Sequence, residues 1–500
     1  MSAHNKKGTI SLLNEEKNYV ILSSSFFNMT TKATHYLLYV LFLSLCVFTA
    51  ACSDEESFTT AADAKLSFSS DTVSFDTIFS GISSSTERFN VYNRNSKAVR
   101  LSNVKLESGG ASGFRMNVDG QYGSSLSNID ILKNDSIFVF VEVTCKEQQT
   151  ATPALVSDAI VFTLENGMQQ KVVLEAYGQN IRMMKAVTIK NDTTISSSIP
   201  VVVYDSLVVA EGATLNIDAG TTLCFHNDAN LLVHGNLNIN GTLEKPVTLR
   251  GDRTDKMFPY LPYDRLDGQW GGVWISSTSK ACSIKYADIH SGCFGIICDS
   301  IKEGIVIENS IIHNVAGDAL RLTDCKALVA NTQISNAFGN CVGIYGGSAD
   351  FYYCTLAQFY PWDGDRESAL YVSNSIGDET HLVEHANFLN CFVTGYADDE
   401  VFGNPGENEL NIRFYNCVLM TDVSDEQYFI DCTAEAKDKD KYKETNFTLF
   451  DTDTYSYDFH LDSLSTAREM GAAEYSALYP LDKDGTPRGT SPDAGCYQWK

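Results

Sequence analysis

Two consecutive stretches of the chain share one spacing: LVVAEGATLNIDAGTTLCF at residues 207–225 and LLVHGNLNINGTLEKPVTL at residues 231–249. Both alternate apolar and polar residues in short runs, which is typical of β-strands with one buried face. The apolar positions recur 22 to 24 residues apart, as Leu207 with Leu231, Val209 with Val233, Leu215 with Leu237, Ile217 with Ile239, and Phe225 with Leu249. The pattern predicts a repeating unit built from short strands.

A second series with the same period comes next, and it continues after insertions. Its apolar members are Ile289, Ile312, Ile334, Leu356, Phe388 and Leu419. A small residue stands two positions before each of them: Ala287, Ser310, Thr332, Cys354, Ala386 and Cys417. Two positions after most of them stands an amide or hydroxyl residue: Ser291, Asn314, Asn336, Gln358 and Asn390. The next strand of each repeat supplies the pairs Ile296/Cys298, Leu320/Leu322, Val342/Ile344 and Leu370/Val372.

A period of this length made of alternating strands predicts a parallel β-helix over residues 190–460. Each repeat is one turn of a coil, and its inward side chains stack on the equivalent residues of the next turn. A leucine-rich repeat has a similar period, but its LxxLxLxxN signature is missing. We expect the amide row to form a ladder at a turn, and the cysteines at small inward positions to be buried thiols.

The segment from residue 65 to residue 180 has a different pattern of short strands separated by turn residues. Runs such as IFVFVEV at 137–143 are rich in β-branched and aromatic residues,. With no helical periodicity, they predict a β-sandwich. The whole chain is therefore expected to be all-β, with a sandwich followed by a parallel β-helix.

The first 52 residues carry the marks of a secretory signal. An apolar run at 36–48 is too short to span a bilayer, and small residues lead from it to Cys52,. Met29 is the more ordinary start for such a signal. Residues 53–64 are small and polar, which predicts a tether. The thiol and the freed amine of Cys52 can both carry acyl chains, so Cys52 is the candidate for lipid attachment and for the sole link to the membrane.

Three segments resemble parts of known proteins. The Cys52 signal and the acidic SDEE after it resemble those of Bacteroidota surface lipoproteins. The run from FDTIFSG to VVLEAYGQ, within 66–180, resembles the immunoglobulin-like module that precedes pectate-lyase-like β-helices in that group. Residues 461–500 resemble the closing segment of bacterial β-helix proteins. The resemblance implies a right-handed coil, an outer-membrane location facing outward, and a cap over the end of the coil.

Charge limits the partners. The chain carries −26 at pH 7, and removing residues 1–51 deletes four lysines and two glutamates, which gives −28. A surface this acidic repels phosphate backbones, so nucleic acid is excluded as a partner. A polysaccharide or a surface protein remains, and acidic polysaccharides would require a bridging divalent cation.

Outward positions of adjacent turns offer few catalytic groups. The row Asp288, Ile311, Gln333, Thr355, Asn387 and Val418 contains one acid. The next strand supplies two further outward rows, and together they contain one acid, Asp299. The first row is Ile297, Arg321, Gly343 and Tyr371, and the second is Asp299, Thr323, Tyr345 and Ser373. These rows predict neither a calcium site nor a carboxylate pair, so no metal or cofactor is expected unless the protein is a calcium-dependent lyase. His290 and His313 fall on equivalent positions and can stack, either as plain surface imidazoles or as a proton shuttle or metal pair.

Two segments concentrate aromatic and charged residues. FYPWDGDRES at 359–368 interrupts the period and supplies the catalytic candidates Asp363, Asp365 and Arg366. FPYLPYDRLDGQWGGVW at 258–274 is the second, and packing explains its Trp270 and Trp274 at least as well as ligand contact. The candidates for carbohydrate contact are Trp362, Tyr260, Tyr263, Arg321, Tyr345 and Tyr371.

Three functions remain open on the sequence. The first is a non-catalytic surface protein that presents a β-helix face to glycans or to a partner. The second is a polysaccharide lyase or glycoside hydrolase acting near 359–368 or on the face around 290–321. The third is a structural or adhesive spacer. Clustered outward acids would favour the enzyme, and an aromatic strip without acids would favour binding.

Overall fold

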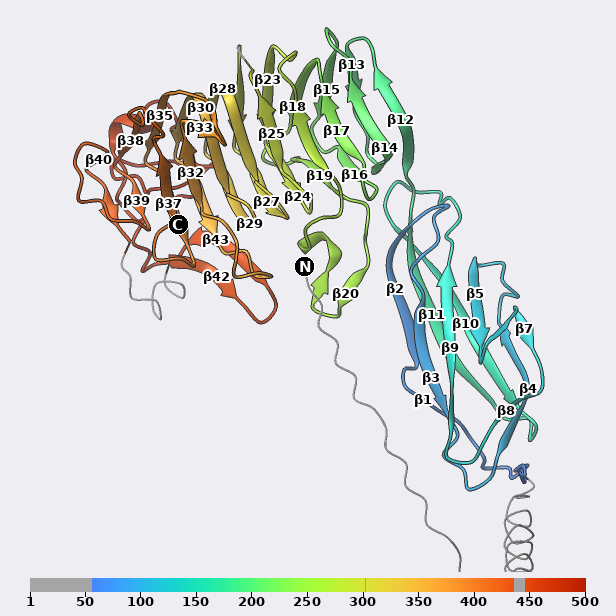
Figure 1. Cartoon of the computed structure of the whole chain (residues 1–500). Helices are drawn as coiled ribbons and strands as arrows, with labels where there is room; N and C mark the ends of the chain where they lie inside the picture. The colour runs from blue at the N-terminus through green and yellow to red at the C-terminus, as the bar shows by residue number, and fades with distance from the viewer. Residues whose placement is uncertain (1–55, 302, 436–445) are drawn as a thin grey trace, which may run out of the picture.

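The computed structural model describes residues 56–301, 303–435 and 446–500, and their regular structure is almost entirely β-strand (Figure 1). Two sheets of five and six strands form an N-terminal unit, and a single sheet of 26 strands comes after it. The predicted signal segment and the predicted lipid attachment at Cys52 lie outside the described residues. Within the described part, no helix has both the length and the apolar character needed to cross a membrane.

The N-terminal unit covers residues 67–179 and buries one core between its two sheets. Alternation produces this core: in β9, Ile137, Val139 and Val141 point inward while Phe138 and Phe140 are exposed,. The first sheet contains β1 (Ser67–Phe68), β3 (Glu87–Tyr92), β9 (Ser136–Val143), β5 (Phe114–Val118) and β6 (Gln121–Tyr122). The second contains β2 (Thr72–Phe79), β11 (Gln169–Gln179), β10 (Ala154–Leu164), β4 (Val99–Leu106), β7 (Ser125–Leu126) and β8 (Ile129–Ile131).

The described part of the expected tether is not free of the N-terminal unit. Phe58 forms a parallel bridge with Ala98, and the guanidinium of Arg100 lies 4.3 Å from the centre of the Phe58 ring. Ala64 is buried. An apolar side chain within a polar segment therefore docks the chain onto the sheet before β1 begins.

The large sheet winds into a coil of parallel strands, consistent with a parallel β-helix (Figure 1). It begins with β12 (Arg182–Ile189) and ends with β41 (Thr433–Ala434), so it starts earlier and stops earlier than the predicted range of 190–460. Each turn of the coil adds a strand to each of three walls. Strands β12, β14 (Val201–Val209), β28 (Leu320–Ala330) and β30 (Val342–Tyr352) are long enough to belong to two walls each.

Each wall is a stack of parallel strands, one from each turn. Wall 1 contains the first halves of β12 and β14, followed by β16 (Thr222–Phe225), β19 (Val247–Gly251), β24 (Ala287–His290), β27 (Ile311–Val315), β29 (Gln333–Ala337), β31 (Thr355–Gln358), β36 (Phe392–Gly395), β39 (Val418–Leu419) and β41. Wall 2 contains the second halves of β12 and β14, followed by β17 (Asn230–Val233), β22 (Gly272–Ile275), β25 (Ile296–Asp299), the first halves of β28 and β30, β32 (Leu370–Ser373) and β37 (Val401–Asn404). Wall 3 contains β13 (Thr193–Ile195), β15 (Thr214–Asp218), β18 (Asn236–Asn240), β23 (Ala281–Lys285), β26 (Gly304–Glu308), the second halves of β28 and β30, β35 (Val383–Leu389), β38 (Ile412–Tyr415) and β40 (Phe429–Ile430).

Stacking of equivalent inward residues builds the core of the coil. The predicted pairs from Leu207–Leu231 to Ile217–Ile239 are confirmed, as are those of the strands that begin at Ile296, Leu320, Val342 and Leu370. The predicted partner of Phe225 is wrong, because Leu249 pairs with Leu223. The ladder of wall 1 is Leu223, Leu249, Ile289, Ile312, Ile334, Leu356, Val393 and Leu419.

Phe388 does not continue the wall 1 ladder as predicted. Its strand pairs with β30, and its ring stacks between Phe351 and Phe414 at 4.8 and 4.9 Å on wall 3. The insertion after Leu356 contains the extra hairpin of β33 (Ser375–Ile376) and β34 (Glu379–Thr380). These added residues make this turn longer than the repeat, so the 22-residue spacing no longer gives the ladder position. Cys391 therefore replaces Ala386 in the row of small residues, and Phe392 replaces Asn387 in the outward row.

Asparagine side chains of adjacent rungs bond to each other at two corners of the coil. The side-chain amide of Asn336 donates to Asn314 Oδ1 at 3.2 Å, which confirms that part of the predicted row, whereas Gln358 donates to the backbone carbonyls of Gly339 and Glu367. Asn390 belongs to the other corner, where the amide of Asn331 donates to Asn309 Oδ1 at 3.2 Å. These asparagines have φ between 48° and 55°, a left-handed conformation that asparagine tolerates,.

The twelve cysteines after Cys52 are all free thiols, and ten of them are buried. This confirms the prediction that several serve as small apolar residues. Burial raises the pKa of Cys282 to about 11 and that of Cys224 to about 12, so these thiols stay protonated and unreactive at neutral pH,.

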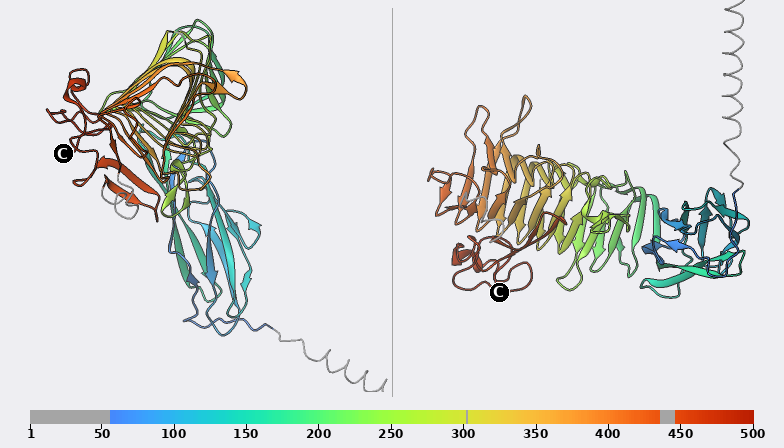
Figure 2. Two further views of the ribbon diagram at one scale, coloured as in Figure 1. Left: turned by 60° about the vertical axis from the view of Figure 1, so that its left-hand side comes forward. Right: turned by 90° about the horizontal axis from the view of Figure 1, so that it is seen from below.

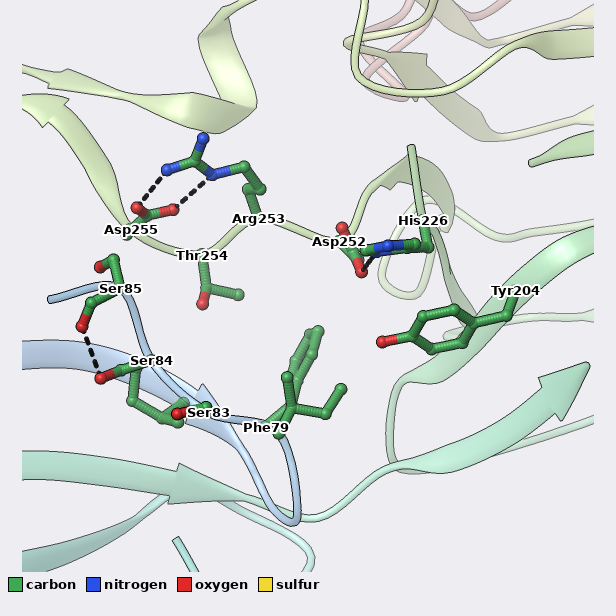
Figure 3. Close-up of a pocket in the computed structure, with 12 residues that line it drawn as sticks. Phe79, Ser83, Ser84, Ser85, Tyr204, His226, Asp252, Arg253, Thr254 and Asp255 are labelled. Atoms are coloured by element: carbon green, nitrogen blue, oxygen red, sulfur yellow. Dashed lines mark hydrogen bonds and ion pairs between the residues drawn. The ribbon is translucent and has the colours of Figure 1, made fainter. Parts of the chain in front are cut away.

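The N-terminal unit packs against the first turns of the coil through Phe79, which contacts the buried side chains of Val202 and Cys224. A segment inserted between β19 and β22 crosses this junction: Thr254 donates to the carbonyl of Thr77, and Lys256 Nζ lies 3.2 Å from Asp76 Oδ2. A pocket of about 290 Å³ remains beside it, with Tyr204 and the hydrogen-bonded side chains of His226 and Asp252 on one side and Ser83, Ser84 and Ser85 on the other (Figure 3).

The C-terminal segment packs along wall 1, whereas a cap over the end of the coil was predicted (Figure 2). It contains the hairpin of β42 (Phe447–Asp451) and β43 (Ser456–Leu461) and the short helix α3 (Ala473–Ser476). Its apolar residues cover the outward side chains of Ala357, Phe392 and Val418. Arg488 donates to Asn331 Oδ1 at 2.9 Å, and Cys496 N–H donates to Thr355 Oγ1 at 3.0 Å. The apolar outward residues of late wall 1 are the physical reason for this docking.

Neighbouring isoleucines of β27 test the stacking. Ile312 is fully buried in the ladder, whereas Ile311 points outward and is partly exposed. We expect Ile312→Ala to lower the free energy of unfolding of the coil by about 2–5 kcal/mol, because it leaves a cavity in the stack. Ile311→Ala should cost less than about 1 kcal/mol. Denaturant unfolding of both variants measures the difference, and equal losses would contradict inward stacking at Ile312.

Candidate functional site

A row of outward-facing positions, several of them with large side chains, runs along wall 2. In register from β17 to β37, the outward positions are Leu232, Trp274, Ile297, Arg321, Gly343, Tyr371 and Phe402. Trp274 is 37% exposed and Phe402 is 47% exposed. Strands in such a sheet are about 4.8 Å apart, so each turn adds one contact to the row.

Gly343 leaves a gap in this row that a neighbouring tyrosine fills. A side chain at position 343 would meet the Tyr345 ring at 3.0 Å, so the ring lies over the glycine. There it sits 4.6 Å from the guanidinium of Arg321 and 5.7 Å from the ring centre of Tyr371. We call the set Trp274, Ile297, Arg321, Tyr345, Tyr371 and Phe402 the aromatic strip.

The strip combines apolar faces with two hydrogen-bond donors. Burial, helped by the nearby carboxylate of Asp318, raises the pKa of Tyr345 to about 12, so its hydroxyl stays protonated at neutral pH. Arg321 supplies a guanidinium that is 34% exposed. The adjoining row of Asp299, Thr323, Tyr345, Ser373 and Asn404 contains one carboxylate. The strip is therefore apolar and donor-bearing, with few groups suited to acid–base chemistry.

A second site lies on wall 1, where the C-terminal segment ends. Asp288 and His290 alternate on β24 and point outward, and His313 occupies the position of His290 on the next turn. The two imidazole rings lie 4.9 Å apart, which confirms the predicted stack. Asp288 Oδ1 lies 2.8 Å from His290 Nδ1 and 3.2 Å from His313 Nε2. The two imidazoles outweigh the effect of burial and hold the pKa of Asp288 well below its usual range.

The C-terminal hairpin forms the opposite side of this site. The groove between them, here called the histidine groove, has a volume of about 470 Å³ and is also lined by Arg265, Gln333, Asn336, His460 and Lys483. Tyr497 donates to Gln333 Oε1 at 2.7 Å and thereby joins the two sides. His460 bonds through Nδ1 to Asp458, and its Nε2 lies 2.6 Å from Asp484 Oδ2.

The residues predicted for carbohydrate contact divide between the two sides of the coil. Arg321, Tyr345 and Tyr371 come together in the aromatic strip. Tyr260 stacks on Phe258 at 5.7 Å, and Tyr263 lies under the guanidinium of Arg253, both in the segment inserted before β22. Trp362 packs against Tyr455 of the C-terminal hairpin at 4.3 Å.

The predicted catalytic candidates Asp363, Asp365 and Arg366 lie together on one turn. Asp363 and Asp365 are exposed, and Asp363 Oδ1 accepts a hydrogen bond from the Asp365 backbone at 2.9 Å. The guanidinium of Arg366 lies 4.7 Å from the centre of the Tyr396 ring. Their catalytic role stays a prediction.

Three residues of the two sites were missed or left open on the sequence. For Trp274 the sequence left packing and ligand contact open, and the structure places it on the strip with Phe294 edge-on at 5.3 Å. Trp270 is fully buried, as packing predicts. Phe402 comes after the insertion that lengthens one turn beyond the repeat, so the sequence spacing did not place it in the outward row of Arg321 and Tyr371. Asp288 was noted only as an isolated acid, although the alternation Asp-x-His places its carboxylate beside His290 on one strand face.

Comparison with known proteins does not assign the chain to a protein family. No protein-family model matches the chain, and no curated protein matches it by sequence. Among solved structures, the chain is similar to a family 123 glycoside hydrolase from Clostridium perfringens (11% identity, TM-score 0.17, covering 24% of this chain and 30% of that one). It is also similar to the Vibrio cholerae VesB protease (15%, 0.17, 23% and 31%) and to a PapD-like domain of human CEP192 (10%, 0.17, 26% and 94%). The chain thus spans less than a third of the length of the first two.

The charge on His460 is expected to stabilise the docked C-terminal segment in a pH-dependent way. Burial opposes that charge, but the hydrogen bonds to Asp458 and Asp484 outweigh it and raise the pKa of His460 to about 9. Because this pKa lies above the unfolded value of about 6.5, the stabilisation is complete below pH 6.5 and is lost as the pH rises through about 9.

Thermal unfolding of the wild type and of His460→Gln at several pH values measures this effect. The wild type should melt at a higher temperature than the variant at pH 6, and the difference should shrink by about pH 9.5. A difference that does not change with pH would show that His460 is not charged in the groove.

Proposed function

We propose that this protein is a lipid-anchored surface protein that binds polysaccharide along the aromatic strip without cleaving it. The observation that supports the proposal best is the register of the strip. Trp274, Arg321 and Tyr371 are held on rigid parallel strands, with Tyr345 and Phe402 beside them. Aromatic faces of this kind suit the apolar faces of sugar rings, and the Arg321 and Tyr345 donors suit their hydroxyls.

The composition of the strip favours binding over cleavage. Glycoside hydrolysis needs two carboxyl groups on either side of the scissile bond, about 5 to 10 Å apart. The two outward rows of wall 2 between β25 and β37 contain one carboxylate, that of Asp299. Asp318 adds a carboxylate beside the strip, but it is 11% exposed and accepts hydrogen bonds from Asn340, so a ligand stacked on Tyr345 and Tyr371 would meet no exposed carboxylate pair in these rows.

Charge narrows the class of ligand to neutral polysaccharides. The net charge of −26 repels acidic chains, and Arg321 is the one cation among the strip residues,. Successive contacts about 4.8 Å apart favour an extended chain over a single sugar, because several weak contacts along one polymer act together.

The proposal also includes the handedness of the coil, the class of the N-terminal unit and the lipid anchor that the sequence predicts. It takes the coil as right-handed, the N-terminal unit as immunoglobulin-like, and Cys52 as the lipid-bearing residue of a Bacteroidota-type surface lipoprotein. The docked Phe58 supports a short link between the anchor and the N-terminal unit. In this arrangement the unit is a spacer that carries the coil away from the membrane.

Removal of two aromatic side chains tests the binding. We expect Trp274→Ala combined with Tyr371→Ala to weaken binding of a neutral polysaccharide at least about tenfold, because each ring supplies part of the stacking surface. Affinity electrophoresis against a panel of plant and host polysaccharides measures the change. Tyr122→Ala is the matched control, since Tyr122 is 81% exposed but lies on the N-terminal unit.

Two results would count against the proposal. Unchanged affinity of the double variant would remove the strip as the binding surface. Release of reducing ends from any bound polysaccharide by the wild type, lost in Asp363→Ala or Arg366→Ala, would instead make the protein an enzyme with its site at 359–368.

A further inference from the structure

The histidine groove contains a set of metal-binding side chains that the proposed function does not use. Asp288, His290 and His313 each offer one donor atom, and these three atoms lie within 4.8 Å of one another. A tetrahedral ion with bonds of ~2.1 Å needs donor atoms about 3.4 Å apart. Asp288 Oδ1 is 2.8 Å from the nitrogen of His290 and 3.2 Å from that of His313. The donors of His290 and His313 lie within 4.8 Å of each other, so bringing all three donors to this spacing requires movements on the order of 1 Å,.

The fold holds these donors in place. Asp288 and His290 lie on the same face of β24 because alternate residues of a strand share a face, and His313 pairs with His290 across the rung,. The buried indole of Trp270 donates from Nε1 to the His290 carbonyl at 2.8 Å and fixes that end of the strand. Donors on rigid strands lose little freedom when they bind an ion.

The site is open on one side only. The His290 side chain is 9% exposed, whereas those of His313 and Asp288 are 24% and 35% exposed toward the groove. Three protein ligands with an open fourth position are typical of metal sites that accept water or a substrate. Asn336 also lines the groove, and its Oδ1 is buried without a hydrogen-bond partner among the described residues.

We propose that Asp288, His290 and His313 bind one divalent transition-metal ion of the Zn²⁺ class, with the fourth position facing the histidine groove. The donor set decides the class: two imidazole nitrogens and one carboxylate oxygen suit Zn²⁺ and its neighbours, whereas Ca²⁺ and Mg²⁺ prefer oxygen ligands alone. His290 binds through Nδ1 and His313 through Nε2, so each ring carries its proton on the other nitrogen.

The site is independent of the proposed polysaccharide binding. It lies on wall 1, and the aromatic strip lies on wall 2. Arg265, Lys483 and His460 also line the groove, and the carboxylates of Asp458 and Asp484 pair with His460 and Lys483 there.

Titration of the purified full chain tests the proposal with Zn²⁺ in competition with a chromophoric chelator. We expect one ion per chain, and at least about 100-fold weaker binding in His313→Gln. Co²⁺ in place of Zn²⁺ should give the visible absorption of a tetrahedral site in the wild type, and the variant should lose it. His385→Gln is the matched control, because His385 Nε2 also lies 3.3 Å from a carboxylate, that of Asp350, but on wall 3.

Asp288→Asn is the second variant, since it keeps the shape of the side chain while removing the charge. It should also weaken binding, and circular dichroism should show that both variants keep their β-structure. No binding of one equivalent by the wild type would overturn the proposal. Equal affinity in the wild type, His313→Gln and Asp288→Asn would overturn it as well.

Discussion

The structure depends on one constraint, which is that no turn of the coil can bury its own apolar side chains. Each inward residue is covered only by its counterparts one turn before and one turn after, as Ile312 is by Ile289 and Ile334,. Register is therefore fixed along the whole coil, because a shift by one residue would move every apolar side chain outward. At the corners of the coil, asparagine side chains bond to the equivalent asparagines one rung away. Inside the coil, the buried thiols serve as small apolar residues.

The same register creates both candidate sites. Because the inward residues of successive turns stack on one another, the outward residues of the same strands are also held at a fixed spacing. A binding site on the outside of the coil therefore needs only suitable residues at equivalent positions of adjacent turns. Wall 2 carries aromatic residues there, and Gly343 lets Tyr345 fold into the row. Wall 1 carries Asp288, His290 and His313, and further along it becomes apolar and is covered by the C-terminal segment. The histidine groove lies at that change from polar to apolar, which explains why both elements line it.

Much of the fold could be predicted from the sequence, since the period and the alternation specify which residues stack wherever repeats are uninterrupted. After the insertion near 360–380 the 22-residue spacing no longer identified the ladder position. Apolar residues alternate on every wall, so Phe388 and Val393 fit the pattern equally well. The docking of the C-terminal segment on wall 1 could not be predicted, because it depends on outward residues such as Phe392, whose wall was misassigned. Half of the strip was found as Arg321, Tyr345 and Tyr371. The cluster at Asp288 was missed because the outward rows were tested for calcium sites and carboxylate pairs, and the predicted histidine pair was not combined with the acid two residues before His290.

Hydrogen–deuterium exchange with and without a bound neutral polysaccharide shows whether the register of wall 2 builds a binding surface. We expect slower exchange in β22, β25, β28, β30 and β32 when the polysaccharide is bound, with no change in the N-terminal unit. Slower exchange confined to wall 1, or to the turn at residues 359–368, would contradict a binding surface on wall 2 and would place the ligand elsewhere on the coil.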